Sequence, residues 1–323
     1  MSRSAPTNST NENQVIPGTE LTLEDLNRHW PSGKVGYVAL LGRPNVGKST
    51  LLNSILDHHL AAVSAKPQTT RRRWLGIYCE EDCQLLFLDT PGVHQPKLVL
   101  GEAMQGAITQ AIRDADVLVI LVDALRRQGE EDGLVAERAA AAARIPALLT
   151  INKCDEATDE QIAAAEEFYR KRLGKEIPAL HVSGCDRSTL DELLQGIRDR
   201  LPEGPFLYDP EELTDAIVRE LGADLIREVV MNVLRQEVPH ATAVTIEQWD
   251  EGAKPPLVQA TLHVERDSQK GIVVGQGGQT IGQIRREAEA LLSDTFGTVK
   301  LKLWVKVSKD WRKRRGFVRD LMG

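Results

Sequence analysis

The chain has 323 residues, of which 41% are hydrophobic and 27% charged, with a formal net charge of −7. These proportions are ordinary for a globular protein, and the length leaves room for two domains with separate cores. Four scattered cysteines exclude a disulfide framework and favour a reducing compartment. Because no apolar run is long enough to span a membrane, we expect a cytoplasmic protein.

Residues 1–34 are rich in Ser, Thr and Asn and contain few apolar positions. They lack the apolar core of a secretion signal, and their acidic residues argue against an organelle transit peptide. We predict a disordered N-terminal tail.

Residues 35–203 alternate short apolar runs with helical patterns. This alternation predicts an α/β domain with a doubly wound, mostly parallel sheet, whose ligands bind at the carboxyl ends of the strands. The predicted strands are 35–41, 73–79, 84–89, 116–122, 146–151 and 178–182, and the predicted helices include 129–143, 157–173 and 188–200.

A complete phosphate-binding loop lies between the first predicted strand and a helix that continues through residues 50–56. Such loops aim backbone N–H groups at phosphate oxygens, and the dipole of the following helix favours the same negative charge. We expect Lys48 to reach the β- and γ-phosphates and the Ser49 hydroxyl to ligate Mg²⁺. The predicted nucleotide contacts here are Gly42, Arg43, Pro44, Asn45, Val46, Gly47, Lys48, Ser49 and Thr50.

Two further segments are candidates for sensing a γ-phosphate. Residues 89–92 end the third predicted strand, where the acid can hold Mg²⁺ through water and the glycine N–H can contact the phosphate. Thr70, before the second strand, can complete the Mg²⁺ coordination when γ-phosphate is present, and we prefer it to Thr69. The predicted catalytic residues are Lys48, Thr70, Asp89 and Gly92; Thr90 and Pro91 are further nucleotide contacts, and Ser49 and Thr70 are the metal ligands.

The base is expected to be guanine. Asn152, Lys153 and Asp155 follow the fifth predicted strand, and the Asp155 carboxylate can accept from guanine's ring N–H and amino group together. Adenine offers neither arrangement and would leave this carboxylate unpaired. Ser183 and Gly184, after the sixth strand, are candidates to present backbone N–H groups to the guanine carbonyl.

The pattern changes after residue 201. Three prolines and a glycine within 201–210 predict an interdomain linker, which we assign to 204–212. The remaining segment, 213–323, has the predicted order helix, strand, strand, helix, helix, strand. Its elements are a long helix over Glu211–Gln236, strands at Thr242–Gln248, Leu257–Glu265 and Val299–Val307, and a short helix on each side of the glycine-rich residues 275–278, the second of them at 280–292.

This smaller α+β segment resembles a type II KH domain, an RNA-binding module. Its Gly-x-x-Gly loop would be Gly275, Gln276, Gly277 and Gly278, which let a nucleic-acid backbone approach closely. KH loops often carry a basic residue between the glycines, and this loop has none. The attraction for phosphate must then come from neighbours such as Lys270, Arg285 and Arg286.

Charge is distributed unevenly along the chain. Residues 254–323 contain 14 basic and 7 acidic residues, whereas the preceding 253 contain 26 and 40. The basic end indicates a polyanionic partner, with a solvated charged surface as the alternative. Arg71, Arg72 and Arg73 are likewise either a partner contact or the solvated start of a strand. Trp311, in the basic stretch 311–317, either stacks on RNA, touches a membrane surface or packs inward.

Together these motifs resemble the Era family, bacterial ribosome-assembly GTPases that join a Ras-like GTPase domain to a type II KH domain. The resemblance covers about residues 35–323. It implies slow GTP hydrolysis to GDP with Mg²⁺, binding of 16S ribosomal RNA near its 3′ end, and assistance to 30S subunit assembly. It also implies peripheral membrane contact. We expect a monomer because no oligomerisation surface is evident.

Two positions depart from the general GTPase pattern. Gly184 stands where alanine is usual, and Val93 stands where Ras-like proteins carry a catalytic glutamine. Since Val93 cannot hold water by a hydrogen bond, the attacking water must be positioned by another group. One hypothesis is that Asn45 helps to hold a K⁺ ion near the phosphates; the alternative is that Asn45 only shapes the loop.

Two other functional classes fit part of the pattern. A metabolic kinase would use the same phosphate loop, but it has no need of the guanine-reading residues 152–155. An RNA-binding module that holds GTP without turnover shares every motif, and only single-turnover hydrolysis separates it from a cycling switch.

Overall fold

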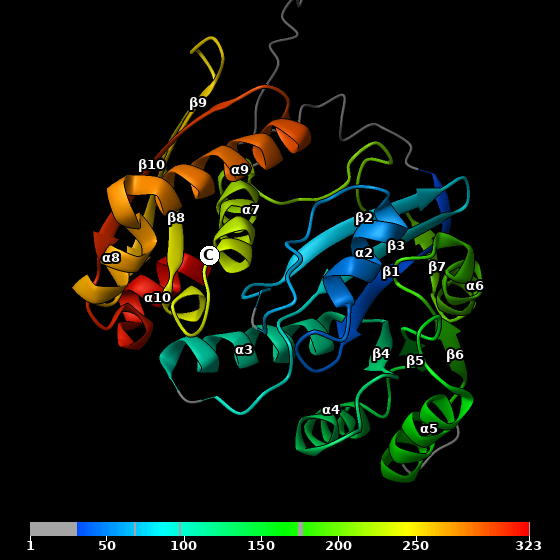
Figure 1. Ribbon diagram of the computed structural model, residues 1–323. Helices are drawn as coiled ribbons and strands as arrows, with labels where there is room; N and C mark the ends of the chain where they lie inside the picture. The colour runs from blue at the N-terminus through cyan, green and yellow to red at the C-terminus, as the bar shows by residue number, and fades with distance from the viewer. Residues whose placement is uncertain (1–30, 68, 97, 174–176, 323) are drawn as a thin grey trace, which may run out of the picture.

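The computed structural model describes residues 31–67, 69–96, 98–173 and 177–322 (Figure 1). The tail predicted at 1–34 lies outside these ranges except for its last residues, which begin the first strand at Ser32. Among the described residues, no helix is both long and apolar enough to cross a bilayer.

The first domain is built on a seven-stranded sheet whose main path is β2-β3-β1-β4-β5-β6, with β7 also pairing with β1. Neighbours are parallel except for the β2–β3 and β1–β7 pairs. The strands are β1 (Ser32–Leu41), β2 (Trp74–Glu80), β3 (Cys83–Asp89), β4 (Val117–Asp123), β5 (Ala147–Asn152), β6 (Ala179–Val182) and β7 (Glu203–Pro205).

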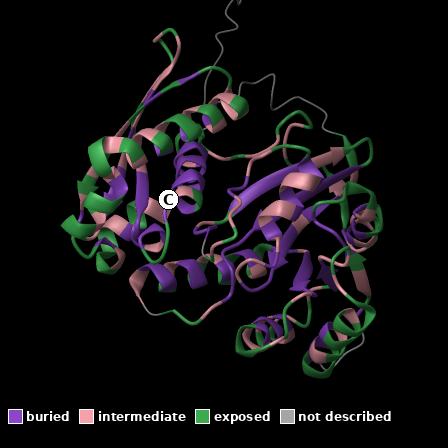
Figure 2. Cartoon of the chain, viewed as in Figure 1, coloured by how far each residue is buried: buried purple, intermediate pink, exposed green. Residues whose placement is uncertain are grey.

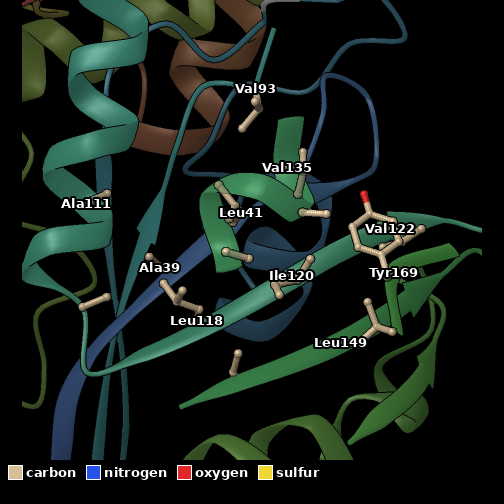
Figure 3. Close-up of a cluster of buried hydrophobic side chains, with 14 of the residues drawn as sticks. Ala39, Leu41, Val93, Ala111, Leu118, Ile120, Val122, Val135, Leu149 and Tyr169 are labelled. Atoms are coloured by element: carbon tan, nitrogen blue, oxygen red, sulfur yellow. The ribbon is translucent and has the colours of Figure 1, made fainter. Parts of the chain in front are cut away.

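Helices cover both faces of this sheet, as the alternation of apolar runs predicts. Leu51 of α2 and Ile197 of α6 pack on one face. Ala111 of α3, Val135 of α4 and Tyr169 of α5 pack on the other (Figure 3). The helices are α2 (Lys48–Leu56), α3 (Val99–Asp114), α4 (Glu130–Ala141), α5 (Asp159–Leu173) and α6 (Asp191–Arg198).

The C-terminal domain has a three-stranded sheet in the order β10-β9-β8, with β10 parallel and β8 antiparallel to β9. Its core lies between this sheet and the two long helices, and α7 is the most deeply buried helix in this half (Figure 2). The elements are α7 (Val218–Val233), β8 (Ala243–Asp250), β9 (Leu257–Val264), α8 (Asp267–Val274), α9 (Gln279–Phe296), β10 (Lys300–Val307) and α10 (Arg315–Met322). Their order up to β10 is the one predicted for a type II KH domain.

The segment predicted as a linker is largely attached to the first domain. Residues 203–205 form β7 at the start of β1, and the Gln84 side chain accepts from the backbone N–H groups of Leu207 and Tyr208. Farther on, Leu213 O accepts from Ile77 N at 2.9 Å. Because residues near 213 bond to the edge of β2, α7 begins only at Val218, later than the predicted Glu211.

Helix α3 is not among the elements predicted above, because Gly101 and Gly106 interrupt its pattern. It is nevertheless 16 residues long and reaches the C-terminal domain (Figure 1). There Met104 belongs to the same apolar cluster as Trp311 and Val318. Trp311 is fully buried, and its Nε1 donates to Ala241 O at 2.9 Å. Of the roles considered for Trp311, the inward-packed one is therefore what the structure shows.

Candidate GTP-binding site

The phosphate-binding loop connects β1 to the N-terminus of α2. Gly47, which precedes the helix, has φ 99°, and a Cβ atom there would lie 2.4 Å from Asn152 Nδ2. Only glycine fits that backbone conformation and that space. Lys48 is buried, with Nζ 3.2 Å from Arg43 O and 3.4 Å from Gly42 O. Burial lowers the pKa of Lys48 to about 8, and the nearby Asp89 opposes this shift.

Three oxygen-bearing side chains meet at the start of α2. Ser49 Oγ lies 2.9 Å from Thr70 Oγ1 and donates to Asp89 Oδ2 at 2.7 Å. Burial raises the pKa of Asp89, and its other oxygen, Oδ1, is buried without a hydrogen-bond partner among the described groups. A buried carboxylate beside two hydroxyls is the hard oxygen donor set that Mg²⁺ prefers. The predicted metal ligands thus fit the ion.

The same geometry separates the two candidate threonines. Thr70 Oγ1 points toward Ser49 and Asp89, whereas Thr69 Oγ1 donates to Lys66 O at 2.8 Å within its own loop. This arrangement favours Thr70 as the ligand, in agreement with the preference from the sequence; the assignment itself stays a prediction.

The segment after β3 packs directly on the phosphate-binding loop. Val93 N donates to Gly42 O at 3.0 Å, and a Cβ atom on Gly92 would lie 2.4 Å from Pro44 N. The Thr90 hydroxyl donates to Leu40 O at 2.7 Å. Val93 is 1% exposed and belongs to the core cluster under the sheet (Figure 3). Its side chain is therefore part of the core and does not orient water.

Asn152, the first of the predicted guanine-reading residues, is held by the phosphate-binding loop itself. Asn152 Nδ2 donates to Val46 O, and Asn152 Oδ1 accepts from Gly184 N, both at 2.8 Å. Asp155 is exposed and available to a base. Ser183 N donates to Thr189 Oγ1 at 2.9 Å. Because the N–H groups of Ser183 and Gly184 are both engaged inside the protein, their contact with guanine stays a prediction.

Two acidic residues that the sequence analysis missed support these motifs. Asp123, at the end of β4, accepts from Lys153 Nζ at 2.7 Å and so fixes the side chain expected to cover the guanine ring. Asp132, fully buried in α4, pairs with Arg43 at 3.0 Å. The Arg43 guanidinium is therefore directed at α4, which leaves its backbone for the predicted nucleotide contact. An acid that closes an apolar strand is the only sequence signal available for Asp123.

The switch loop, residues 59–73, is attached to the C-terminal domain on both sides of Thr70. Before Thr70, Glu228 of α7 accepts from His59 Nε2 at 2.8 Å and from Val63 N at 3.0 Å. Lys66 Nζ donates to the carbonyls of Met231 and Leu234 at the end of the same helix.

After Thr70, the three consecutive arginines of the switch loop are all engaged. Arg71 is 3% exposed; it donates to Thr242 O at 2.7 Å and its guanidinium lies 5.4 Å from the Trp311 ring centroid. Arg72 pairs with Glu220 of α7, and Arg73 with Asp114 of α3. Arg71 is thus neither a partner contact nor a solvated strand start, because it lies inside the interface between the two domains.

The candidate RNA loop lies between α8 and α9. Gly275, Gly277 and Gly278 all have positive φ, at 73°, 59° and 80°, and Gly277 and Gly278 have open space where a Cβ atom would stand. Such a bare turn allows close approach of a nucleic-acid backbone. Of the neighbouring basic residues, Lys270 and Arg286 are exposed, whereas Arg285 pairs with Glu289 at 3.1 Å. Lys270 and Arg286 are therefore the better placed for phosphate.

Both predicted domains match known protein families. Residues 37–153 match a family described as 50S ribosome-binding GTPase, and residues 237–312 match the KH domain family. GTPase Era of Lactobacillus delbrueckii subsp. bulgaricus is 40% identical over 296 residues, covering 89% of this chain and 95% of its own.

Two solved structures are similar over nearly their whole length. A point variant of Aquifex aeolicus Era bound to GDP·AlF4⁻ has a TM-score of 0.85 and 36% identity, covering 90% of this chain and 99% of its own. A structure of Era with MgGDPNP and nucleotides 1506–1542 of 16S ribosomal RNA gives 0.85 and 35% with the same coverage. The predicted fold class, a Ras-like GTPase domain followed by a type II KH domain, is confirmed, and the chain belongs to the Era family of GTPases.

Proposed function

We propose that this GTPase is a switch that binds 16S ribosomal RNA near its 3′ end and assists assembly of the 30S subunit. The relative whose complex contains nucleotides 1506–1542 of 16S ribosomal RNA supports the choice of RNA. The open glycine loop at 275–278 and the basic end of the chain supply the chemistry for such a ligand.

The observation that supports a switch is the attachment of the switch loop to the KH domain. Thr70, the expected γ-phosphate-dependent Mg²⁺ ligand, lies between Lys66 and Arg71, and both of these donate to KH backbone carbonyls. A shift of Thr70 toward the metal must therefore move or break contacts with α7 and residues 240–242. GTP would then bias the position of the KH domain, and RNA binding would bias the nucleotide site in return.

Hydrolysis is expected to depend on positioning and charge. Mg²⁺ supplies positive charge to the β- and γ-phosphate oxygens when it is bound, and Ser49 and Thr70 would hold it, with Asp89 acting through water. Lys48 and the backbone N–H groups of the loop would bind the phosphates. Since Val93 lies in the core, this chain provides no glutamine-like group there to orient the water, which accounts for a slow reaction.

Asn45 is a candidate for holding K⁺ beside the phosphates. Its φ is 63°, and its Nδ2 donates to Ala65 O of the switch loop at 2.6 Å, so Oδ1 is the atom of this side chain that would ligate the cation. A monovalent cation there would add positive charge in the transition state. Equal single-turnover rates in sodium and potassium buffers would contradict this role, and Asn45→Ala should remove any difference that wild type shows.

The remaining proposals concern the state of the protein in the cell. We expect a cytoplasmic monomer with peripheral membrane contact. Light scattering after size exclusion tests the monomer, and flotation with anionic vesicles tests the contact.

RNA binding provides the direct test of this function. Short single-stranded RNAs copying the 3′ end of 16S ribosomal RNA should bind wild type selectively over scrambled RNAs. Gly277→Asp should abolish binding because it places a negative charge and a side chain in the open loop. Gly277→Asn is the matched control, since asparagine has the same size and tolerates the positive φ without adding charge. Loss in the Asp variant with unchanged GTP hydrolysis supports the assignment; unselective binding in all variants contradicts it.

Two controls separate the rival classes. A competition assay should show guanine nucleotides, and not adenine nucleotides, displacing bound GDP, which a metabolic kinase would not require. A single-turnover reaction should convert bound GTP to GDP, and complete stability of bound GTP would instead indicate an RNA-binding module without turnover.

A further inference from the structure

The outer face of the KH sheet carries a row of basic side chains around an exposed tryptophan. β10 lies at the edge of this sheet beside β9. Leu301, Leu303 and Val305 of β10 pack on the core, so the alternate side chains point to the opposite face. Those side chains belong to Lys300, Lys302, Trp304 and Lys306; the lysines are exposed, and Trp304 is 48% exposed.

This row runs past the glycine loop. Leu301 N donates to Glu289 Oε2 and Val299 N to Ser293 Oγ, so α9 and β10 lie alongside each other in opposite directions. Going back from Glu289 to Gly278 covers about 16 Å of helix, and going forward from Leu301 to Lys306 covers about 16 Å of strand. The glycine loop is therefore level with the Trp304–Lys306 end of the edge strand. An extended chain that leaves the loop crosses that edge.

The surroundings concentrate the positive charge at this edge. Lys302 and Trp304 lie beside the neutral Gln259 and Thr261 of β9. The acids around this edge already have partners: Glu289 pairs with Lys300, Glu265 after the end of β9 pairs with Arg312, and Glu247 on β8 accepts from Thr245. Lys302 and Lys306 are thus the lysines best placed for an external phosphate.

Lysines on an edge strand have another common role, which is to prevent pairing with other chains. That role does not explain Trp304, because a half-exposed aromatic ring in a strand promotes association. A ring flanked by lysines on the path of a nucleic-acid backbone is instead the arrangement that stacks single-stranded bases.

We propose that the outer face of β10 is a second RNA contact, in which Lys302 and Lys306 bind phosphates and Trp304 stacks on a base of the single strand flanking the glycine loop. The proposal rests on the proposed function, since it extends the same RNA beyond the KH groove.

The test compares two RNAs that copy the 3′ end of 16S ribosomal RNA. One has about six nucleotides, enough for a groove of about four bases, and the other about sixteen. Lys302→Gln/Lys306→Gln is paired with Lys171→Gln/Lys254→Gln, which removes two exposed lysines elsewhere and gives the same net charge. Affinities are measured over a range of salt concentrations, and anionic phosphatidylserine vesicles serve as a separate arm.

For the long RNA, the β10 double variant should reduce the slope of log K against log salt by about 1.4, from two phosphates at about 0.7 each. Trp304→Ala should lower the affinity for the long RNA by about fivefold or more. The short RNA should be unaffected by either change, and the control double variant should match wild type for both RNAs.

Other outcomes overturn the proposal. If the β10 and control double variants have the same affinities, the β10 face makes no contact of its own. The same follows if the affinity for the short RNA falls as much as the affinity for the long RNA. If the β10 variant loses vesicle binding and keeps its RNA affinity, the surface meets membrane instead. Failure of wild type to bind either RNA would contradict the proposed function together with this extension.

Discussion

Trp74 Nε1 donates to Asp224 Oδ2 at 3.0 Å, and this bond joins the first residue of β2 in the GTPase domain to α7 in the KH domain. Both residues are buried, and Asp224 also accepts from Arg227 Nε at 3.3 Å. The strand that follows the switch loop is thereby fixed to the same helix whose other end accepts from Lys66.

Trp74→Phe should therefore destabilise the docked arrangement. It removes one donor from a buried carboxylate, a change that costs about 1–3 kcal/mol. A double-mutant cycle with Asp224→Ala, which removes the acceptor, should give a coupling energy of about 1 kcal/mol or more when unfolding is measured by chemical denaturation. Arg73→Gln is the control, because the Arg73–Asp114 pair is exposed and pairs of that kind contribute about 1 kcal/mol at most. Equal effects of the Trp74 and Arg73 changes would argue against a structural role for the buried bond.

Thr70→Ala should slow single-turnover GTP hydrolysis by roughly 10- to 100-fold, because it removes a hydroxyl that we expect to contact the metal only when γ-phosphate is present. GDP affinity should change little, and Thr70→Ser should restore most of the rate. Thr69→Ala is the matched control, since its hydroxyl bonds within the loop. A larger loss in the Thr69 variant would reverse the assignment.

Asp155→Asn should change the base that the site selects. We expect the carboxylate to accept two hydrogen bonds from guanine, whereas the amide of the variant presents a donor suited to the second carbonyl of xanthine. GTP affinity should fall by roughly 100-fold or more, and xanthosine triphosphate should compete better than it does with wild type. Unchanged preference for GTP would mean that Asp155 does not read the base.

Nucleotide binding should weaken in mildly alkaline solution. Lys48 has its pKa lowered to about 8 in the free protein, and phosphate oxygens favour its charged form, so binding above that pH takes up a proton. GDP affinity should be nearly constant below about pH 7.5 and fall about sixfold between about pH 7 and 8.8. Calorimetry in buffers of different ionisation enthalpy measures the proton uptake directly. A flat affinity with no uptake would contradict the lowered pKa.

The sequence predicts best those parts of the site whose chemistry is local. Gly47, Lys48 and Ser49 are recognisable because a phosphate-binding loop must be contiguous. Asn152 and Asp155 are recognisable because they stand close together, at the end of an apolar strand and directly after it. The role of Arg71 is not predictable in this way, since it depends on carbonyls about 170 residues later in the chain. The Arg43–Asp132 ion pair is not predictable for the same reason, because the two residues are far apart in the sequence.

The ends of helices and strands are likewise hard to predict where they depend on contacts with distant parts of the chain. Alternating apolar runs locate six of the seven described strands of the GTPase sheet to within a few residues; β7, three residues long, is not among the predicted strands. The start of α7 at Val218 is set by the edge of β2, where Leu213 bonds to Ile77, and local helix propensity cannot reveal that competition.

We propose that the GTP site and the RNA site are coupled through the switch loop. The most direct test measures the affinity for 16S 3′-end RNA of the protein bound to a GTP analogue and of the protein bound to GDP, together with the affinity for both nucleotides at saturating RNA. We predict RNA affinities that differ by about fivefold or more, with a matching change in nucleotide preference, because coupling is reciprocal. Equal RNA affinities in the two nucleotide states would contradict this coupling.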